Sequence, residues 1–386
     1  MADRIEKMIA QTFLDMATAL ETGSIGRRPV IALTGMGSEH GEENAMAGAV
    51  AAAAKGVDVV YIGTKTDPRV RTSAVSDEEE AHKRMEELLE SGEVDGAVTM
   101  HYPFPIGVST VGRAVTPGRG KPMYIATTTG TSSTDRIEGM IKNAIYGIIA
   151  AKACGNPNPT VGIANLDGAR QTETALKKLK ENGYPIQFAE SARADGGCVM
   201  RGNDLLNASA DIMITDSLTG NLLIKMLSAF STGGSFEATG WGYGPGIGEG
   251  YDRLVMIVSR ASGAPVIAGA LEYAAELVRG NWKKVSKQEF DAANKAGFRE
   301  ICAAAKKASA PKAASEEEVK MPPKEIATGA IPGIEVMDLE DAVKALWKEN
   351  IYAESGMGCT GPIILVPDAK LDAAQEILKK AGYIGG

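Results

Sequence analysis

Cys359 is the residue whose surroundings best suit covalent chemistry. It lies in the run Gly356-Met357-Gly358-Cys359-Thr360-Gly361-Pro362, where three glycines leave the thiol uncrowded. An accessible thiol near backbone N–H groups favours the thiolate, which is the nucleophilic form of cysteine. Most single cysteines are instead buried and inert, as we expect for Cys154 and Cys302 in alanine-rich helices. Cys198, which follows two glycines, stays the competing candidate for a reactive thiol.

The segment from Thr34 to Gly41 is a candidate anion site. It follows a short apolar run and precedes an alanine-rich stretch, so it connects a predicted strand to a predicted helix. Gly35, Gly37 and Ser38 could offer backbone N–H groups at the helix N-terminus, a geometry that attracts phosphate. The segment matches neither the dinucleotide nor the nucleoside-triphosphate fingerprint. A tight turn that needs glycine for its backbone angles is the alternative interpretation.

Seven hydroxyl residues stand between Thr127 and Thr134, directly before another predicted helix. The central ones, Thr131, Ser132 and Ser133, could hold a phosphate or a carboxylate together with free N–H groups. The alternative is a helix cap followed by a polar loop. Seven hydroxyls exceed what a cap requires, so both interpretations stay open.

Asn221 and Lys225 follow the last long apolar run of the first 220 residues. Asp216 and Asn221 could orient a ligand there, and Lys225 could neutralise its charge. The alternative is that Ser217 or Thr219 only caps a helix.

Glycine occupies every second position from Gly240 to Gly250. Because glycine inside a strand or helix is destabilising, this pattern predicts a mobile loop that carries Trp241 and Tyr243. A lid or a partner contact is the functional interpretation, and a simple connector is the alternative.

The composition excludes several classes of protein. The 386 residues carry a net charge of −8, with 44% hydrophobic and 23% charged residues, which is typical of a globular protein. The acidic balance argues against nucleic-acid binding, and no run reaches the ~18 apolar residues of a membrane helix. The charged N-terminus lacks a secretory apolar region, and the four separated cysteines suit a reducing compartment. We therefore expect a cytoplasmic protein, and its three isolated histidines argue against a histidine metal site.

Short apolar runs alternate with helical patterns from about residue 30 to residue 279, after an amphipathic helix over 4–20. Such alternation predicts an α/β fold with a mostly parallel sheet covered on both faces. Ligands bind such sheets beyond the carboxyl ends of the strands, where the loops described above fall. The predicted strands cover 30–33, 57–62, 94–100, 122–127, 160–163, 185–189, 211–215 and 253–259.

The composition changes near residue 283, where lysine, alanine and glutamate dominate and predict a helix followed by a solvated linker. A compact unit resumes near 326, with a helix that begins at Asp338, a strand over 363–366 and a last helix over 368–380. A unit of about 60 residues is marginal alone, so we expect it to pack on the body. The predicted divisions are a body of residues 1–282, a helical segment and charged linker of 283–325, and a C-terminal unit of 326–386 that carries Cys359.

The body resembles the phosphate acyltransferase family of bacterial phospholipid synthesis. The stretches that carry the resemblance are 31–40, 210–221 together with Lys225, and 255–270. That family is a relative of the phosphotransacetylases, and the resemblance implies a three-layer α/β/α fold. It also implies the transfer of an acyl group from a thioester to inorganic phosphate.

With the tail GMGCTGP included, the whole chain resembles the family of component C alpha subunits of glycine/sarcosine/betaine reductase complexes. The resemblance implies that a selenoprotein, component A, delivers a carboxymethyl group, which component C converts to an acetyl thioester on its own cysteine. Phosphate then releases acetyl phosphate, and the family's active-site thiol falls on Cys359. The resemblance also implies a component C beta subunit as partner, an oligomer, and phosphate as substrate without a cofactor or metal.

Phosphate and the developing oxyanion need N–H donors and cations near the thioester. Other interpretations are an acyltransferase that uses acyl carrier protein, a non-catalytic scaffold subunit and a redox thiol switch. No general base stands out, although His40 or His101 could approach Cys359 in space. The candidate phosphate ligands are Gly35, Gly37, Ser38, Thr131, Ser132, Ser133, Asn221 and Lys225.

Overall fold

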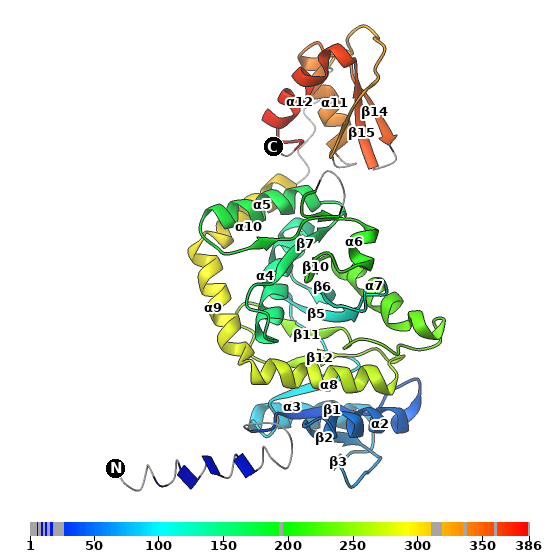
Figure 1. Cartoon of the computed structure of the whole chain (residues 1–386), viewed down its shortest axis with the longest axis vertical. Helices are drawn as coiled ribbons and strands as arrows, with labels where there is room; N and C mark the ends of the chain where they lie inside the picture. Colours follow the sequence, from blue (N-terminus) through cyan, green and yellow to red (C-terminus); the bar gives the residue numbers. More distant parts are fainter. Residues whose placement is uncertain are drawn as a thin grey trace.

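The computed structural model describes residues 27–192, 196–309, 319–334, 338–358 and 361–384, with scattered positions between 6 and 17 that are helical. The body strands are β1 (Val30–Thr34), β2 (Asp58–Gly63), β3 (Arg71–Ala74), β4 (Gly96–Thr99), β5 (Val108–Val115), β6 (Pro122–Thr131), β7 (Thr160–Ala164), β8 (Gln187–Phe188), β9 (Val199–Met200), β10 (Ile212–Ile214), β11 (Gly244–Ile247) and β12 (Val255–Ile257). In the described residues they form one twelve-stranded sheet, in the order β3-β2-β1-β4-β12-β11-β5-β6-β10-β7-β8 with β9 beside β7 (Figure 1).

The sheet consists of two parallel groups joined by antiparallel strands. β3, β2, β1, β4 and β12 pair in parallel, and so do β6, β10, β7, β8 and β9. Between the groups, β5 pairs antiparallel with β6 and β11, and β11 pairs antiparallel with β12. The prediction of an α/β fold with a mostly parallel sheet is therefore confirmed.

Helices cover both faces of the sheet, which makes the body a three-layer α/β/α structure. On β1, Ile31 and Leu33 belong to a core shared with α2 and α8, whereas Val30 and Ala32 belong to a core shared with α3. This follows from the strand period of two, which sends successive side chains to opposite faces. The body helices are α2 (Gly41–Ala53), α3 (Glu78–Ser91), α4 (Arg136–Ala153), α5 (Ala169–Glu181), α6 (Gly202–Leu206), α7 (Ser217–Ala229), α8 (Ala264–Arg279), α9 (Trp282–Lys295) and α10 (Phe298–Ser309).

The predicted mobile loop over 240–250 is wrong, because this segment includes β11 in the interior of the sheet. Gly244 has a φ of +89°, and a Cβ atom there would lie 1.7 Å from the carbonyl oxygen of Val111. The alternating glycines thus permit a close approach of two backbones rather than motion. The side chain of Tyr243 is buried rather than carried on a mobile loop. Like β11, the strand β5 has no counterpart among the predicted strands.

The helices α9 and α10 rest on the body. Phe290, Phe298 and Ile301 belong to the same apolar core as α4 and α5. The charged linker that follows falls largely on residues 310–318, which lie outside the described residues. The division of the chain at 283 and 325 stays a prediction.

The C-terminal unit has its own sheet and core. Its antiparallel strands run in the order β13 (Gly329–Pro332), β15 (Gly361–Val366) and β14 (Glu354–Gly358), with α11 (Leu339–Lys348) and α12 (Leu371–Lys380) packed on them. Figure 1 shows the unit beyond the end of the body that α5 and α10 form. Gly358 pairs with Gly361 across the hairpin. Cys359 and Thr360, between them in the chain, lie outside the described residues.

Candidate active site

The loop after β1 and the segment after β12 meet at the carboxyl ends of these parallel strands. The backbone N–H of Glu39 donates to the carbonyl oxygen of Arg260 at 2.9 Å. In return, the Arg260 guanidinium donates to the carbonyl oxygen of Gly37 at 3.2 Å. The His40 ring nitrogen Nε2 lies 3.3 Å from the carbonyl oxygen of Ala261. These contacts place the cation of Arg260 directly beside the loop of residues 34–41 that contains Gly35 and Gly37 (the glycine loop).

Local packing accounts for the residue types in the glycine loop. A Cβ atom on Gly35 would lie 2.0 Å from the hydroxyl of Tyr61, and Gly37 has a φ of +87°. The Ser38 hydroxyl accepts a hydrogen bond from the backbone N–H of His40 at 3.2 Å. The turn interpretation thus explains Gly35, Gly37 and Ser38 without a ligand. Their contact with phosphate stays a prediction.

Lys225 approaches the same edge of the sheet from α7. Its Nζ atom donates to Glu237 Oε1 at 2.9 Å and to the Ser259 hydroxyl at 3.1 Å. Glu237 is 1% exposed and also accepts hydrogen bonds from the hydroxyls of Tyr243 and Ser262, at 2.8 and 2.7 Å. Burial and the nearby carboxylate of Glu237 raise the pKa of Tyr243, which therefore stays a donor. The buried carboxylate is well paired, as burial of a charge requires.

Two histidines lie close to the glycine loop. His82 of α3 and His101, which follows β4, line a small cavity together with Met36 and Arg260. Their rings meet edge to face with 6.5 Å between centroids. Burial, followed by the charge of His101, lowers the pKa of His82, so its imidazole is neutral at pH 7. A neutral imidazole can accept a proton at this edge of the sheet, and its two ring nitrogens can donate one hydrogen bond and accept another.

The segment of residues 127–134 with its seven hydroxyl residues (the hydroxyl loop) lines a separate cavity of about 220 Å³ between the N-termini of α4 and α7. The Arg136 guanidinium crosses it and donates to Asp216 Oδ2 at 2.6 Å. Asp216 also caps α7 by accepting the backbone N–H of Thr219 at 2.8 Å. The lining residues with polar side chains include Thr131, Ser132, Ser133, Arg136, Asp216 and Ser217.

Protein partners occupy two of the three predicted hydroxyls. Ser132 Oγ donates to Asn143 Oδ1 at 2.7 Å, and Ser133 Oγ donates to Glu138 Oε2 at 2.7 Å. The Thr131 side chain is exposed at the cavity. The cap of α4 is Asp135, which accepts the backbone N–H of Glu138 at 2.8 Å. Ser132 and Ser133 are thus accounted for by side chains of α4 without a ligand, whereas Thr131 faces solvent.

The helix α7 runs from the cavity beside the hydroxyl loop to the edge of the sheet where Lys225 contacts Ser259. Ser217 lines the hydroxyl cavity, and Lys225 contacts Ser259 eight residues later, which corresponds to about 12 Å along a helix. Asn221 is half-buried between them. The structure thus separates the predicted ligands into one group at the glycine loop with Lys225 and another at Thr131, Ser132 and Ser133. Cys359 lies outside the described residues.

Sequence reasoning missed Ser259, Arg260, Glu237 and His82. Ser259 and Arg260 lie two and three residues after the end of the buried strand β12, a position that often carries functional groups in parallel sheets. That position is the signal that could have revealed them. Glu237 and His82 carry no comparable local signal, because their contacts come from distant segments.

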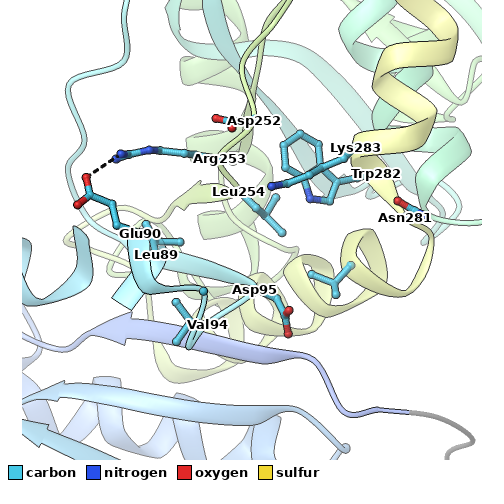
Figure 2. Close-up of a pocket in the computed structure, with 12 residues that line it drawn as sticks. Leu89, Glu90, Val94, Asp95, Asp252, Arg253, Leu254, Asn281, Trp282 and Lys283 are labelled. Atoms are coloured by element: carbon cyan, nitrogen blue, oxygen red, sulfur yellow. Dashed lines mark hydrogen bonds and ion pairs between the residues drawn. The ribbon is translucent and has the colours of Figure 1, made fainter. Parts of the chain in front are cut away.

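A larger cavity of about 530 Å³ lies at the opposite edge of the sheet, at the amino ends of β4 and β12 (Figure 2). It opens between the end of α3 and the junction of α8 with α9. Arg253 at its rim is paired with Glu90 at 3.0 Å and also with Glu86. The cavity is therefore remote from the loops that carry the predicted ligands.

Comparisons with known proteins place the chain in a family. A family model described as "Fatty acid synthesis protein" matches residues 30–365. The phosphate acyltransferase of Thermus thermophilus is 25% identical over 234 residues, which cover 51% of this chain and 70% of that protein. The chain belongs to the fatty acid synthesis protein family, in which its resemblance to the phosphate acyltransferases is confirmed.

One relative matches nearly the whole chain. It is the glycine/sarcosine/betaine reductase complex component C subunit alpha of Peptoclostridium acidaminophilum, 59% identical over 382 residues. The match covers 98% of this chain and 99% of that protein. The resemblance to component C alpha subunits, which rested on the tail around Cys359, is thereby confirmed as well.

Among solved structures, a branched-chain phosphotransacylase from Enterococcus faecalis aligns with a TM-score of 0.45 and 16% identity, over 64% of this chain and 99% of that one. In the described part of the chain, none of the helices is both long and apolar enough to cross a membrane. Nor do the described residues gather three or more histidine, cysteine or acidic side chains into a metal site. The absence of a cofactor stays a prediction.

Proposed function

We propose that this chain forms acetyl phosphate: inorganic phosphate attacks an acetyl thioester on Cys359. The observation that carries the proposal is the 59% identity to a component C alpha subunit over nearly the whole length of both proteins. Membership of a family that includes phosphate acyltransferases supports acyl transfer as the kind of reaction. The selenoprotein component A and a component C beta subunit are the proposed partners, within a cytoplasmic oligomer.

The proposed reaction exchanges one bond at the acetyl carbonyl carbon. A phosphate oxygen attacks this carbon, the new C–O bond forms, and the C–S bond breaks as Cys359 leaves as a thiolate. The thioester keeps the acetyl group activated until phosphate arrives. The oxyanion of the tetrahedral intermediate needs donors, and the phosphate needs cations that hold it against the carbonyl.

The edge of the sheet that carries Lys225, paired with Glu237, and Arg260, paired with Glu78 at 3.2 Å, is the proposed phosphate site. It offers an ammonium and a guanidinium group next to the loop of Gly35, Gly37 and Ser38, and both cationic side chains are about half exposed. Charge-assisted hydrogen bonds from such cations to a phosphate oxygen are about twice as strong as neutral ones. We propose that Thr131, Ser132 and Ser133, which line the cavity at the start of α7 about 12 Å from Lys225, contact the acyl-bearing segment or partner. Asn221, about 6 Å from Lys225 along the same helix, is proposed to do the same.

Arsenolysis of acetyl phosphate tests this function. Acetyl transfer to arsenate gives an unstable product, so a competent enzyme consumes acetyl phosphate steadily. We expect the full chain, with its partner subunit present, to catalyse this loss and to carry one acetyl group on Cys359. Cys359→Ala should lose the activity and the label, whereas Cys154→Ala should keep both. Full activity in Cys359→Ala would refute the mechanism.

An acyltransferase that takes long acyl chains from acyl carrier protein is the alternative function. The match to the "Fatty acid synthesis protein" model favours it. Phosphate-dependent release of long-chain acyl groups, with no reaction of acetyl phosphate, would decide for this alternative. Acetyl label on the beta subunit alone would instead indicate a scaffold role for this chain.

A further inference from the structure

The helix α7 carries a row of large apolar side chains that its own chain leaves exposed. Leu218, Leu222, Met226 and Phe230 are 72%, 56%, 71% and 72% exposed. They are spaced by four residues, so they form one continuous ridge along the outer side of the helix (the outer ridge). Single exposed apolar residues are ordinary on a protein surface, but a continuous apolar row indicates an interaction site. The chemistry proposed above does not use these four side chains.

The inner side of α7 fixes the direction in which the outer ridge points. Gly220 lies so close to β6 that an added Cβ atom would be 1.8 Å from the carbonyl oxygen of Thr127. The side chain of Ile224 fills the space above Gly112 of β5, and it shares an apolar core with Leu227. The helix therefore cannot turn the ridge inward. Figure 1 shows α7 at the side of the body away from α9.

The outer ridge is free of charge, which suits an identical partner. In an isologous dimer a surface meets its own copy across a two-fold axis, so a charged patch near the axis would face its own sign. Lys225 is the one charged residue of α7, and its ammonium group is held beside the ridge by Glu237. Each chain carries a net charge of −8, so two copies approach most easily through an uncharged surface.

The shape and area of the outer ridge match what a dimer needs. A row of side chains spaced by four residues packs into the matching groove of a second such helix, with the helix axes at about −50°. The four side chains expose on the order of 500 Å² together. This is more than half of the ~800 Å² that each partner contributes to a standard interface. The residues that flank the ridge on α7 can supply the rest.

We propose that the outer ridge of α7 is the contact surface of a two-fold symmetric dimer of this chain. The two-fold axis passes between Leu222 and Met226, so Leu222 of each copy meets Met226 of the other. The contact covers the four exposed apolar side chains in both copies. The inference does not depend on the acyl-transfer chemistry.

The oligomeric state of the full chain, measured alone by sedimentation velocity, tests this surface. We expect a dimer of about twice the chain mass of 40.4 kDa. Leu222→Glu should give a monomer, because two carboxylates then enter an apolar contact. Circular dichroism should show that this variant stays folded, since Leu222 is exposed in the single chain. A parent chain that is monomeric, or a Leu222→Glu chain that stays dimeric, would overturn the proposal.

Ile106→Glu is the matched control for this experiment. Ile106 is 75% exposed and lies beside Phe290 and Phe298, on the face of the body opposite α7. This variant should stay dimeric. A chain that is monomeric alone and loses its beta subunit through Leu222→Glu would assign the outer ridge to that subunit instead.

A pair of opposite charges tests the two-fold register. Leu222→Glu combined with Met226→Lys places a carboxylate of each copy opposite an ammonium group of the other. This double variant should dimerise more tightly than either single variant, and added salt should weaken its dimer. Leu222→Glu combined with Leu218→Lys has the same net charge and the same spacing within one chain, but its charges do not meet across the axis, so it should stay monomeric. Equal behaviour of the two double variants would contradict the contact between Leu222 and Met226.

Discussion

Lys225 and Glu237 form an ion pair of 2.9 Å in which the acid is 1% exposed and the base is 48% exposed. This asymmetry gives the two side chains different tasks. The buried carboxylate needs its partners because an unpaired charge is costly in the interior. The ammonium group, in contrast, reaches solvent beside Ser259 and retains capacity for an anion.

Lys225→Met should therefore have two effects that can be separated. We expect the KM for phosphate to rise at least about tenfold, because a charge-assisted hydrogen bond is lost. Stability should fall by about 2 kcal/mol, less than for a fully buried pair, because the hydroxyls of Tyr243 and Ser262 still bind Glu237. Adding Glu237→Gln should restore most of the stability but not the KM. Urea unfolding measures the stability, and steady-state kinetics measure the KM. If the double variant recovered both the stability and the KM for phosphate, Lys225 would have a structural role only.

Native alkylation should single out Cys359. Burial raises the pKa of Cys154, Cys198 and Cys302 to about 12 each. At pH 8, only about one in ten thousand of such thiols is ionised, and the thiolate is the form that reacts. We expect iodoacetamide to label Cys359 first in the native chain and all four cysteines after unfolding, as measured by mass spectrometry. Rapid native labelling of Cys198 would revive the competing assignment.

His82 should make stability depend on pH. Burial and the charge of His101 lower the pKa of His82 below its ordinary value of 6.5, so the unfolded chain binds this proton more readily. The stability should be complete above about pH 6.5 and should decrease as the pH falls through the pKa of the folded state. His82→Gln should flatten this dependence in urea unfolding between about pH 7.5 and pH 5. A slope in His82→Gln equal to that of the unchanged chain would exclude this cause.

Gly244→Ala should be far more damaging than a substitution at a loop glycine. The new Cβ would lie 1.7 Å from the carbonyl oxygen of Val111, in the middle of the sheet. We expect a loss of at least about 4 kcal/mol or failure to fold. Gly233→Ala also has a positive φ, but no atom lies within 4 Å of its new Cβ, so about 1 kcal/mol is expected. Similar unfolding midpoints for the two variants would place residues 240–250 outside the sheet.

Much of the fold was predictable because its signals are local. Each apolar run such as Val30–Leu33 is long enough for one strand, and the helical patterns between the runs require crossovers that make neighbouring strands parallel. The start of α11 after Asp338 and the strand within β15 were predictable for the same reason. The antiparallel strands β5 and β11 were not, because glycines and hydroxyl residues replace the apolar alternation there. Close approaches in the folded sheet explain these glycines, such as that of Gly244 to Val111 and that of Gly246 to Phe104.

The residue types of the candidate site were also readable from the sequence, because a thiol among glycines or hydroxyls before a helix has meaning without long-range contacts. The grouping of those residues was not. Lys225 lies 12 residues from Glu237 and 34 from Ser259, and Arg260 lies 223 residues from Gly37. Arg260 and Gly37 meet because β12 and β1 pair in parallel with opposite edges of β4, so their carboxyl ends lie one strand apart at the same edge of the sheet. The local sequence thus determines which chemical groups are present, and the strand order determines which of them share an edge of the sheet.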